Sequence, residues 1–290
     1  MSYQVDNAVI MAAGTSSRFA PLSYEKPKAL IEVKGELLIE RQLRQLQEAG
    51  ICQVLLVVGY QKEQFAYLKK KFDVILIENN DYLFRNNHAS IYAVKNYLKN
   101  TYICSADNYF TENPFEREVS DAYYAAVYAD GETNEWCMEE DSDGNISQIT
   151  IGGKNAWYML GHAFWNEKFS RKFIEILEKV YRLPETSGLL WESIYASHLD
   201  ELKLKIRKYP KDFIFEFDTL DELRTFDSSY IHDTRSNLLK TAARELQCRE
   251  ADITRIQALK SSDNAAEGFS FWAGKMQYVY SYKTQTIRRI

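Results

Sequence analysis

Cysteine and histidine are scarce in this sequence, and neither residue forms a cluster. The four cysteines are Cys52, Cys104, Cys137 and Cys248, and no two of them form a C-x-x-C pair. The four histidines are equally scattered, so zinc-binding spacings are absent as well. This pattern argues against a disulfide framework or a structural zinc site, and it favours the reduced, buried thiols of a cytoplasmic protein.

Long apolar runs, sequence repeats and an excess of positive charge are also missing. No apolar run is long enough to span a bilayer, and the first residues, MSYQVDN, have neither the basic flank nor the apolar core of an export signal. The formal net charge of -5 argues against a general nucleic-acid-binding surface, although a local basic pocket could still hold a small anion. We therefore expect a cytoplasmic protein that contacts neither nucleic acid nor a membrane.

Aromatic residues, in contrast, are abundant in a chain of otherwise ordinary composition. Hydrophobic residues make up 46% and charged residues 27% of the 290 positions, as in a soluble globular protein. This length suits one large domain or a main domain with an appendage. The 20 tyrosines and 5 tryptophans supply aromatic faces whose use has to be explained.

In the first half of the chain, short apolar runs alternate with segments whose apolar residues recur at helical spacing. The predicted strands cover residues 8–12, 54–58, 74–77 and 102–104, and the predicted helices cover residues 38–49, 63–72 and 90–98. This alternation predicts an α/β fold, in which helices flank a Rossmann-like, mostly parallel sheet. Such sheets bind ligands at the carboxyl ends of their strands, where Gly14, Gly59 and Asp107 fall.

The pattern changes after this first half. Between residues 123 and 164, short alternating segments are broken by Asp143-Gly144 and Gly152-Gly153, which predicts a β-rich lid. Beyond the lid, the patterns predict helices at 168–181 and 190–198, strands at 202–208 and 213–217, and a short helix capped by Asp218 or Thr219.

A domain boundary is expected near residue 228. It separates a main domain of residues 1–228 from a small α+β extension of residues 229–290. Within this extension, residues 232–246 are predicted to form a helix, and residues 269–282 a β-hairpin that turns at Ala273-Gly274.

The stretch VIMAAGTSSRFAPLSYEKPKAL, residues 9–30, follows a buried strand with glycine, hydroxyl groups and two separated cations. Consecutive backbone amides after a strand can form a nest for phosphate oxygens, and Gly14 lets the backbone approach a ligand closely. Arg18 can clamp a phosphate with its planar guanidinium, and Pro27 favours an extended Lys26 that carries Lys28 back toward the same phosphates. No Walker motif is present, so the pattern predicts a phosphate site of another kind, with a plain structural turn as the alternative.

The same stretch resembles the signature of nucleotidyltransferases, which join a nucleoside triphosphate to a phosphorylated small molecule. The segments VVGYQKEQF, SADNY, TNEW and EFDT continue the resemblance, which spans roughly residues 5–227. Together they resemble most the bacterial CTP:phosphocholine cytidylyltransferases. The resemblance implies that a phosphate oxygen of phosphocholine attacks the α-phosphorus of CTP and expels pyrophosphate. It also implies that cations and Mg²⁺, rather than a strong general base, assist this reaction.

The resemblance and the local patterns assign candidate residues to four tasks. The catalytic residues would be Arg18, Lys28 and Asp107. The nucleotide-binding residues would be Ala12, Ala13, Gly14, Thr15, Ser16, Ser17, Gly59, Tyr60, Asn87 and Ser90. The Mg²⁺ ligands would be Asp107, Glu216 and Asp218. The residues that bind the phosphorylated amine would be Tyr109, Glu135, Trp136, Trp165, Trp191 and Glu192.

Several of these residues also have a simpler interpretation. Asp218 and Ser90 could each be only a helix N-cap, and each aromatic ring could be a core residue. Glu216 and Asp218 are expected to be alternate residues of one strand and therefore to point to the same side. The aromatic candidates matter because a trimethylammonium group donates no hydrogen bond, so aromatic faces and acidic neighbours must recognise it.

The same residues are compatible with three other activities. Leu190 stands where phosphocholine enzymes are expected to carry another aromatic residue, so phosphoethanolamine or another small phosphorylated alcohol is an alternative acceptor. A sugar-1-phosphate nucleotidyltransferase is a second possible enzyme. A catalytically silent nucleotide-binding protein is the alternative of another class.

The extension resembles the start of choline kinase-like proteins in its order of helix, strands and hairpin. Its loop KSSDNAAEGFSF, residues 260–271, lacks the usual glycine-and-threonine phosphate loop, and the chain stops before any kinase catalytic core. We expect a remnant without kinase activity that serves as a packing element or forms a homodimer. A C-terminal subdomain without kinase ancestry is the alternative.

Overall fold

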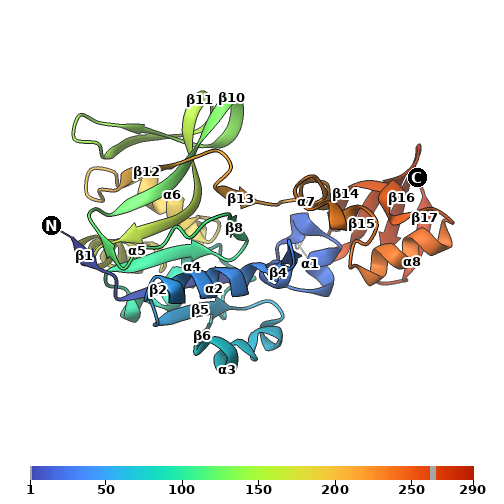
Figure 1. The fold of residues 1–290 in the computed structure, drawn as a ribbon, viewed down its shortest axis with the longest axis horizontal. Helices are drawn as coiled ribbons and strands as arrows, with labels where there is room; N and C mark the ends of the chain where they lie inside the picture. The colour runs from blue at the N-terminus through green and yellow to red at the C-terminus, as the bar shows by residue number, and fades with distance from the viewer. Residues whose placement is uncertain (1, 262–265) are drawn as a thin grey trace. The chain divides into compact units, whose positions relative to one another are not determined.

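The structure is a computed structural model that describes residues 2–261 and 266–290. Its contacts group the chain, drawn in Figure 1, into two compact units. Unit 1 contains Met1–Gly14 and Leu38–Glu216, and unit 2 contains Thr15–Leu37 and Phe217–Ile290. The domain boundary expected near residue 228 stays a prediction. The contacts within the chain group residues 15–37 with residues 217–290.

A seven-stranded sheet forms the centre of unit 1, in the order β12-β10-β11-β7-β2-β5-β6. These strands are β2 (Asn7–Ala12), β5 (Val54–Val58), β6 (Ile75–Glu78), β7 (Thr101–Ser105), β10 (Tyr123–Glu140), β11 (Ile146–Trp165) and β12 (Lys205–Tyr209). Strand β2 is parallel to β5 and β7, β5 is parallel to β6, and β10 is parallel to β12. Only β11 is antiparallel to both of its neighbours. The predicted α/β fold with a mostly parallel sheet is therefore confirmed.

Short strands and helices complete unit 1. The short strands are β1 (Tyr3–Gln4), β8 (Asn108–Phe110), β9 (Glu118–Val119) and β13 (Ile214–Glu216). The helices are α2 (Leu38–Glu48), α3 (Leu68–Phe72), α4 (His88–Ala93), α5 (Glu167–Val180) and α6 (Trp191–Ala196). The single helix predicted at 63–72 is instead a 3-10 turn, Lys62–Phe65, followed by α3, and α4 begins two residues before the predicted start at residue 90.

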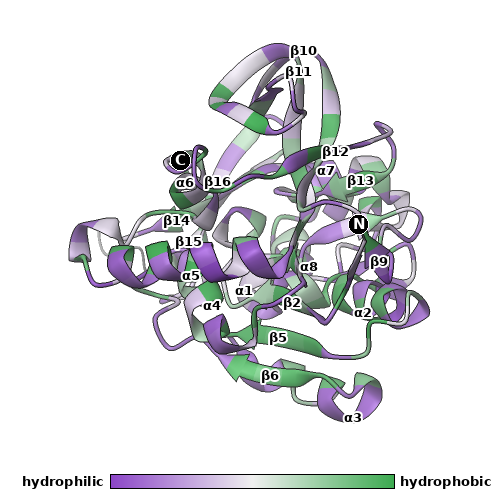
Figure 2. Cartoon of the chain, turned by 90° about the vertical axis from the view of Figure 1, so that its left-hand side faces the viewer, coloured by the Kyte–Doolittle hydropathy of each residue, from purple (hydrophilic) through white to green (hydrophobic). Residues whose placement is uncertain are grey.

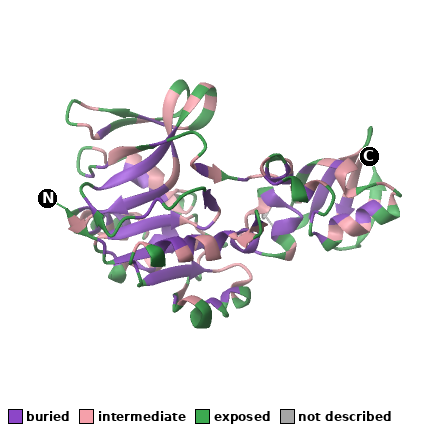
Figure 3. Cartoon of the chain, viewed as in Figure 1, coloured by how far each residue is buried: buried purple, intermediate pink, exposed green. Residues whose placement is uncertain are grey.

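The apolar character of the central strands explains why the sheet lies inside unit 1. Every residue of β5 is buried, and the strand is drawn in the hydrophobic colour in Figure 2. Helix α5, in contrast, buries only one face, with Phe169, Phe173 and Leu177 turned toward the core. Figure 3 shows the result as a buried sheet with exposed connections. A strand that is buried on both faces is apolar along its whole length, whereas a strand with one solvent-exposed face alternates apolar and polar residues.

Strands β10 and β11 form a hairpin that is much longer than predicted. They pair from Tyr123 opposite Phe164 to Glu140 opposite Ile146, and their far ends project from the rest of unit 1 (Figure 1). The turn at Asp143-Gly144 is confirmed, because Gly144 has a φ of 77° and its amide donates to Asp141 O at 3.0 Å. The turn predicted at Gly152-Gly153 is wrong. Both glycines lie inside β11, where shifts of register bend the hairpin instead of ending a strand.

Unit 2 contains a four-stranded antiparallel sheet in the order β14-β15-β16-β17. Its strands are β14 (Ile253–Lys260), β15 (Ala266–Ala273), β16 (Met276–Ser281) and β17 (Thr286–Arg289). The other elements are η1 (Ser17–Phe19), α1 (Leu22–Glu25), η2 (Lys28–Leu30), β3 (Glu32–Val33), β4 (Glu36–Leu37), α7 (Leu220–Phe226), η6 (Ser228–Ile231), α8 (Asn237–Glu245) and η7 (Glu250–Asp252). The hairpin predicted at 269–282 is confirmed as β15 and β16.

The helix predicted at 232–246 is shorter than expected. It begins at Asn237 because the Ser236 side chain caps it by accepting a hydrogen bond from the Leu239 amide at 3.1 Å. Four residues of the loop 260–271, at positions 262–265, lie outside the described residues, so the expectation about that loop is not tested there.

The cysteine prediction is correct for two of the four thiols. All four are free; Cys104 and Cys137 are buried, Cys248 is half-buried and Cys52 is exposed. In the part of the chain that the structure describes, no helix has both the length and the apolarity to cross a bilayer.

Candidate active site

Three charged residues of the predicted site lie together in unit 2. Arg18 Nη1 donates to Asp218 Oδ2 at 2.5 Å, and Lys28 Nζ lies 3.6 Å from Asp218 Oδ1. The Lys28 side chain is only 5% exposed, whereas that of Arg18 is 76% exposed. One carboxylate thus contacts a buried and an exposed cation, and the three groups together carry one positive charge.

The backbone of the intervening segment explains how two cations ten residues apart reach one carboxylate. Ser16 has a left-handed φ of 47°, which turns the chain into η1, and Phe19 is buried with 2% exposure. Lys26 is extended, with φ −152° and ψ 139°, as Pro27 predicts. Lys28 then lies at the start of η2. Arg18 and Lys28 thus contact the two oxygens of one carboxylate, and the expectation that Lys28 reaches the same phosphates as Arg18 stays a prediction.

The Asp218 side chain is not a helix cap. Helix α7 is capped by Thr219, which accepts from the Glu222 amide at 3.2 Å, and the Glu222 carboxylate accepts from the Asp218 and Thr219 amides. The N-cap interpretation of Asp218 is therefore wrong, and its carboxylate is directed to the two cations. Glu216 and Asp218 were expected to be alternate residues of one strand. This is wrong, because strand β13 ends at Glu216 and Asp218 lies beyond it.

The turn that precedes Arg18 has the backbone properties of an anion-binding nest. Among the described residues, no protein acceptor takes a hydrogen bond from the backbone amides of Thr15 to Arg18. Successive unpaired amides at a turn of changing handedness are suited to phosphate oxygens. At Gly14, an added Cβ would have no described heavy atom within 4 Å, so packing within the chain does not require glycine there.

In unit 1, the end of β5 packs tightly against the end of β2. The Tyr60 amide donates to Ala13 O at 3.0 Å, and a Cβ on Gly59 would lie 2.7 Å from the Tyr82 ring and 2.9 Å from Ala13 O. Glycine is therefore required at position 59 by close packing. Tyr82 was missed by the sequence analysis because its contact with Gly59 depends on the fold and not on local spacing.

Ser90 lies inside α4 and is not its N-cap, because Asn87 precedes the helix. The buried Asn79 donates from Nδ2 to Ser90 Oγ at 3.2 Å, and its amide donates to Val58 O at 2.9 Å. Asn79 therefore connects the end of β5 to α4 through two hydrogen bonds. It is a second residue that the sequence analysis missed, since no motif contains it.

Asn87 binds to the start of α6. Its Oδ1 accepts from the Trp191 amide at 2.7 Å, and its Nδ2 donates to Glu192 Oε2 at 3.0 Å. Glu192 Oε1 also accepts from Tyr124 OH at 3.2 Å. Asn87, which was predicted to bind the nucleotide, is thus hydrogen-bonded to Trp191 and Glu192, which were predicted to bind the amine. The sequence analysis did not predict this connection.

An acidic and aromatic cluster surrounds this connection in unit 1. Burial raises the pKa of the Glu192 carboxyl to about 6. Burial, followed by the nearby charges of Glu192 and Glu216, raises the pKa of Tyr124. Burial, followed by the charges of Glu135 and Glu216, raises the pKa of Tyr158. Of these carboxylates, Glu192 contacts Tyr124 directly through the hydrogen bond from Tyr124 OH.

The predicted amine-binding rings differ in how much of their surface is accessible. Trp136 is half-buried, whereas Trp191 is 1% exposed and stacks on Tyr124 with 5.4 Å between ring centroids. Trp165 is completely buried, and its centroid lies 4.6 Å from that of Phe173, so this ring packs in the core. The Arg41 guanidinium lies 4.5 Å from the centroid of Tyr109 and covers one face of that ring.

Asp107 and Glu216 lie near one pair of strands in unit 1. Asp107 is half-buried in the turn between β7 and β8, and Glu216 of β13 pairs with Asn108 of β8. Among the described residues, no group of three His, Cys, Asp or Glu side chains has an arrangement that could hold a metal ion. Mg²⁺ usually uses one or two carboxylates together with substrate phosphates, so carboxylate oxygens such as these fit its chemistry.

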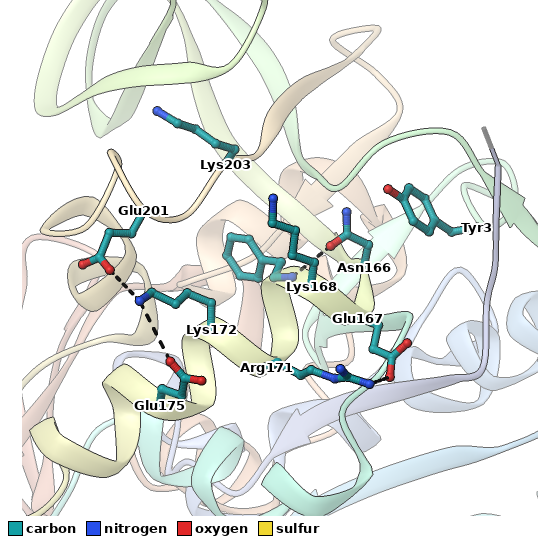
Figure 4. A pocket seen from close by; sticks show the side chains of 10 residues that line it. Tyr3, Asn166, Glu167, Lys168, Arg171, Lys172, Glu175, Glu201 and Lys203 are labelled. Atoms are coloured by element: carbon teal, nitrogen blue, oxygen red, sulfur yellow. Dashed lines mark hydrogen bonds and ion pairs between the residues drawn. The ribbon is translucent and has the colours of Figure 1, made fainter.

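A cavity of about 760 Å³ in unit 1 lies beside the first turns of α5 and is also lined by Tyr3, Glu201 and Lys203 (Figure 4). The N-cap of α5, Asn166, lines it, together with charged residues of that helix. Arg171 pairs with Glu167, and Lys172 pairs with Glu175 and Glu201. Because most of the charges in this cavity are neutralised by each other, it is a polar surface cavity outside the predicted site.

Comparisons with known proteins agree with this architecture. Residues 8–183 match the model of the MobA-like NTP transferase domain. A choline-phosphate cytidylyltransferase from Streptococcus pneumoniae is 34% identical over 220 residues, which cover 76% of this chain and 96% of that protein. A 2-aminoethylphosphonate cytidylyltransferase from Lancefieldella rimae is 36% identical over 234 residues, which cover 79% of this chain and 95% of that protein.

A solved structure shows the same fold. The CTP:phosphocholine cytidylyltransferase from Streptococcus pneumoniae superimposes with a TM-score of 0.75 and 34% identity, covering 78% of this chain and 99% of that one. Together with the domain match over residues 8–183, this similarity shows that the chain is a nucleotidyltransferase of the MobA-like NTP transferase family.

Proposed function

We propose that the protein transfers CMP from CTP to phosphocholine and releases CDP-choline and pyrophosphate. The observation that carries this proposal is the acidic and aromatic cluster of unit 1, in which Glu192 accepts a hydrogen bond from Tyr124 OH at 3.2 Å and Trp191 stacks on the Tyr124 ring. Aromatic faces with nearby carboxylates suit a quaternary ammonium, which cannot be recognised by hydrogen bonds. The similarity to cytidylyltransferases of phosphorylated and phosphonylated amines supports the same conclusion.

In the proposed reaction, a phosphate oxygen of phosphocholine forms a bond to the α-phosphorus of CTP while the bond to pyrophosphate breaks. The acceptor phosphate has a second pKa of about 6 and is largely dianionic at neutral pH, so the protein does not need a strong base. Its main task is to neutralise and orient two anions. Arg18, Lys28 and the amides of residues 14–17 are assigned to the triphosphate, and Gly59-Tyr60 and Ser90 to the base.

We assign a divalent cation, Mg²⁺, to Asp107 with Glu216 or Asp218. When bound, such an ion would withdraw electron density from the α-phosphate and bring its oxygens into fixed geometry. Asp218 already contacts Arg18 and Lys28, so it holds these cations in place for an incoming anion. Trp136 and Glu192 are assigned to the amine, and Asn87 positions Glu192. Trp191, whose ring is 1% exposed and stacks on Tyr124, is assigned to the same site as a residue that supports it from the core.

The proposal is tested by measuring pyrophosphate release with CTP, Mg²⁺ and a panel of acceptors. The panel contains phosphocholine, phosphoethanolamine, 2-aminoethylphosphonate and sugar 1-phosphates, and UTP, GTP and dTTP replace CTP in parallel assays. We expect the highest kcat/KM with CTP and phosphocholine. Activity only with a sugar 1-phosphate, or metal-dependent CTP binding without turnover of any acceptor, would overturn the proposal.

A cytidylyltransferase for a primary amine is the second candidate. Leu190 in place of an aromatic residue favours it, because a smaller ammonium group needs fewer aromatic faces and can donate hydrogen bonds to a carboxylate such as Glu192. The relative from Lancefieldella rimae, named for 2-aminoethylphosphonate, also favours it. The same acceptor panel separates the two candidates.

Replacing Glu192 by glutamine is expected to raise the KM for phosphocholine by about 10- to 30-fold, because a desolvated cation loses its charged partner, worth roughly 2 kcal/mol. In the unchanged protein, the Glu192 carboxyl has a pKa of about 6, so its charge is present above pH 6 and is lost as the pH falls through that value. The substrate phosphate titrates in the same range. We therefore expect kcat/KM to fall more steeply below pH 6 in the unchanged protein than in Glu192→Gln, and identical profiles would contradict this role.

Three further expectations are kept as proposals. They are a cytoplasmic location, a homodimer, and descent of residues 229–290 from the start of a choline kinase-like domain without kinase activity. Sedimentation of the purified chain tests the homodimer. An assay for phosphorylation of choline by ATP tests the expected lack of kinase activity.

A further inference from the structure

We propose that the C-terminal extension, residues 229–290, positions the triphosphate-binding groups and thereby increases the affinity for CTP. The groups in question lie in the signature segment, Thr15–Leu37, and at Asp218, and all belong to unit 2 with the extension. This inference rests on the proposed function in assigning these groups to CTP.

The first set of contacts holds α1, the short helix between Arg18 and Lys28. Tyr24 of α1 stacks on Tyr282 with 3.8 Å between centroids and an angle of 7° between the rings. The neighbouring Glu25 accepts a hydrogen bond at 3.1 Å from the amide of Leu238, in the first turn of α8. Amides of a first helical turn have no partner within the helix, and the helix dipole favours a carboxylate there. The extension thus contacts the signature segment at the element that links the two cations.

A second set of contacts holds the segment on the other side of Lys28. Glu32 O accepts from Tyr230 OH at 2.7 Å and from Arg235 Nη1 at 3.3 Å. Arg235 also pairs with the Glu32 carboxylate at 3.3 Å. The Tyr230 ring is buried with 1% exposure, so this hydrogen bond is shielded from water. Lys28 therefore lies between two places where the extension is bound.

A third set of contacts holds α7, the helix that follows Asp218. The guanidinium of the buried Arg224 donates to Ile253 O at 2.6 Å, to Glu250 O at 2.8 Å and to Tyr230 O at 3.2 Å. Asp221, at the start of the same helix, accepts from the Arg255 amide at 2.9 Å. The extension thus binds both the segment that carries the two cations and the helix that positions their common carboxylate.

These contacts matter because the signature segment has little regular structure of its own. Its helices, η1, α1 and η2, contain only three or four residues each, and isolated helices of this length are unstable in water. The conformation that brings Arg18 and Lys28 to Asp218 therefore depends on tertiary contacts. Preorganised groups bind a ligand more tightly because less freedom is lost on binding.

The test compares Tyr282→Ala with Tyr282→Phe and Tyr278→Ala in the full chain. Tyr282→Phe keeps the stacked ring, and Tyr278 is a matched control because its ring stacks on Phe271 within the same sheet. We expect Tyr282→Ala to raise the KM and the Kd for CTP by about 2- to 10-fold, the range that corresponds to loss of one aromatic pair. The KM for phosphocholine should stay unchanged, Tyr282→Phe should restore CTP binding, and Tyr278→Ala should leave it unaltered.

Hydrogen exchange supplies a readout that does not require turnover. The amides of Tyr24, Glu25 and Lys26 bond to Pro21 and Leu22 carbonyls, and we expect their exchange to accelerate in Tyr282→Ala while β5 stays protected. Tyr230→Phe, which removes one hydroxyl, should have a smaller effect of the same kind. Faster exchange with unchanged CTP affinity, or equal losses of CTP affinity in Tyr282→Ala and Tyr278→Ala, would overturn the inference. If the unchanged protein bound CTP without turnover, the proposed reaction would fail while this inference could still be tested through Kd and exchange.

Discussion

Replacing Lys28 by methionine is expected to lower kcat/KM for CTP by roughly 100- to 1,000-fold, the range found when a preorganised donor to a reacting anion is removed. The effect should be large because the Lys28 side chain is only 5% exposed, so water screens its charge little from a bound phosphate. Methionine keeps roughly the length and the apolar stem of the side chain but removes the ammonium, whose Nζ lies 5.8 Å from the centroid of the Phe19 ring. Pyrophosphate release at several CTP concentrations measures the change.

Arg18→Met provides the matched comparison for Lys28→Met. Both variants remove one cation from Asp218, but the Arg18 side chain is 76% exposed. A solvent-exposed ionic contact is worth about 0–1 kcal/mol, so we expect a loss of about 5-fold or less if Arg18 contributes only through charge. A loss within 3-fold for Lys28→Met, with a cooperative melting transition, would show that this lysine is structural.

Replacing Asp107 by asparagine is expected to lower kcat by roughly 100- to 1,000-fold and to raise the concentration of Mg²⁺ needed for half-maximal activity. An amide still offers one oxygen but no charge, so a divalent ion is held more weakly. Asp107 lies half-buried in a turn at the carboxyl end of β7, and asparagine keeps its size. A titration of kcat with Mg²⁺ measures both effects.

Asp121→Asn is a suitable control for the Asp107 variant. Asp121 is an exposed carboxylate of unit 1 that pairs with Lys205 at 3.3 Å, so its replacement should change neither kcat nor the Mg²⁺ requirement. A folded Asp107→Asn protein with normal activity and normal Mg²⁺ dependence would show that Asp107 is not a metal ligand, and an unfolded one would show that its role is structural. Exchange of Mg²⁺ for Mn²⁺ should recover part of the activity if the lost function is metal binding.

The elements of the main sheet could be predicted from the sequence because their signals are local. Strand β5 was predicted with its observed bounds, since each of its five residues is apolar and buried. The same local reasoning was wrong at Gly152-Gly153, because a glycine in a strand can mark a bulge as well as a turn. Gly59 was assigned to the nucleotide, and the structure adds a packing requirement that comes from Tyr82, 23 positions away along the chain.

The candidate site was only partly predictable, because some of its contacts join residues that are far apart in the sequence. The cations and carboxylates were proposed from their residue types, their spacing and the family resemblance, and their assignment to a nucleotide stays a prediction. Pro27 correctly predicted the extended Lys26. The N-cap interpretations of Ser90 and Asp218 could not be decided locally, because neighbouring residues, Asn87 and Thr219, compete for the same position. Asn79 and the bond from Asn87 to Glu192 were missed, since both connect separate elements.

The sequence by itself determined the α/β pattern, the nucleotidyltransferase signature and the identity of the charged residues. These properties are encoded by residue types within short windows, where backbone preferences and periodicity act. Only the tertiary structure decided that Asp218 meets Arg18 from 200 positions away, and that the extension packs on the signature segment. Such contacts depend on how whole elements fill space and satisfy buried polar groups, and no local pattern specifies them.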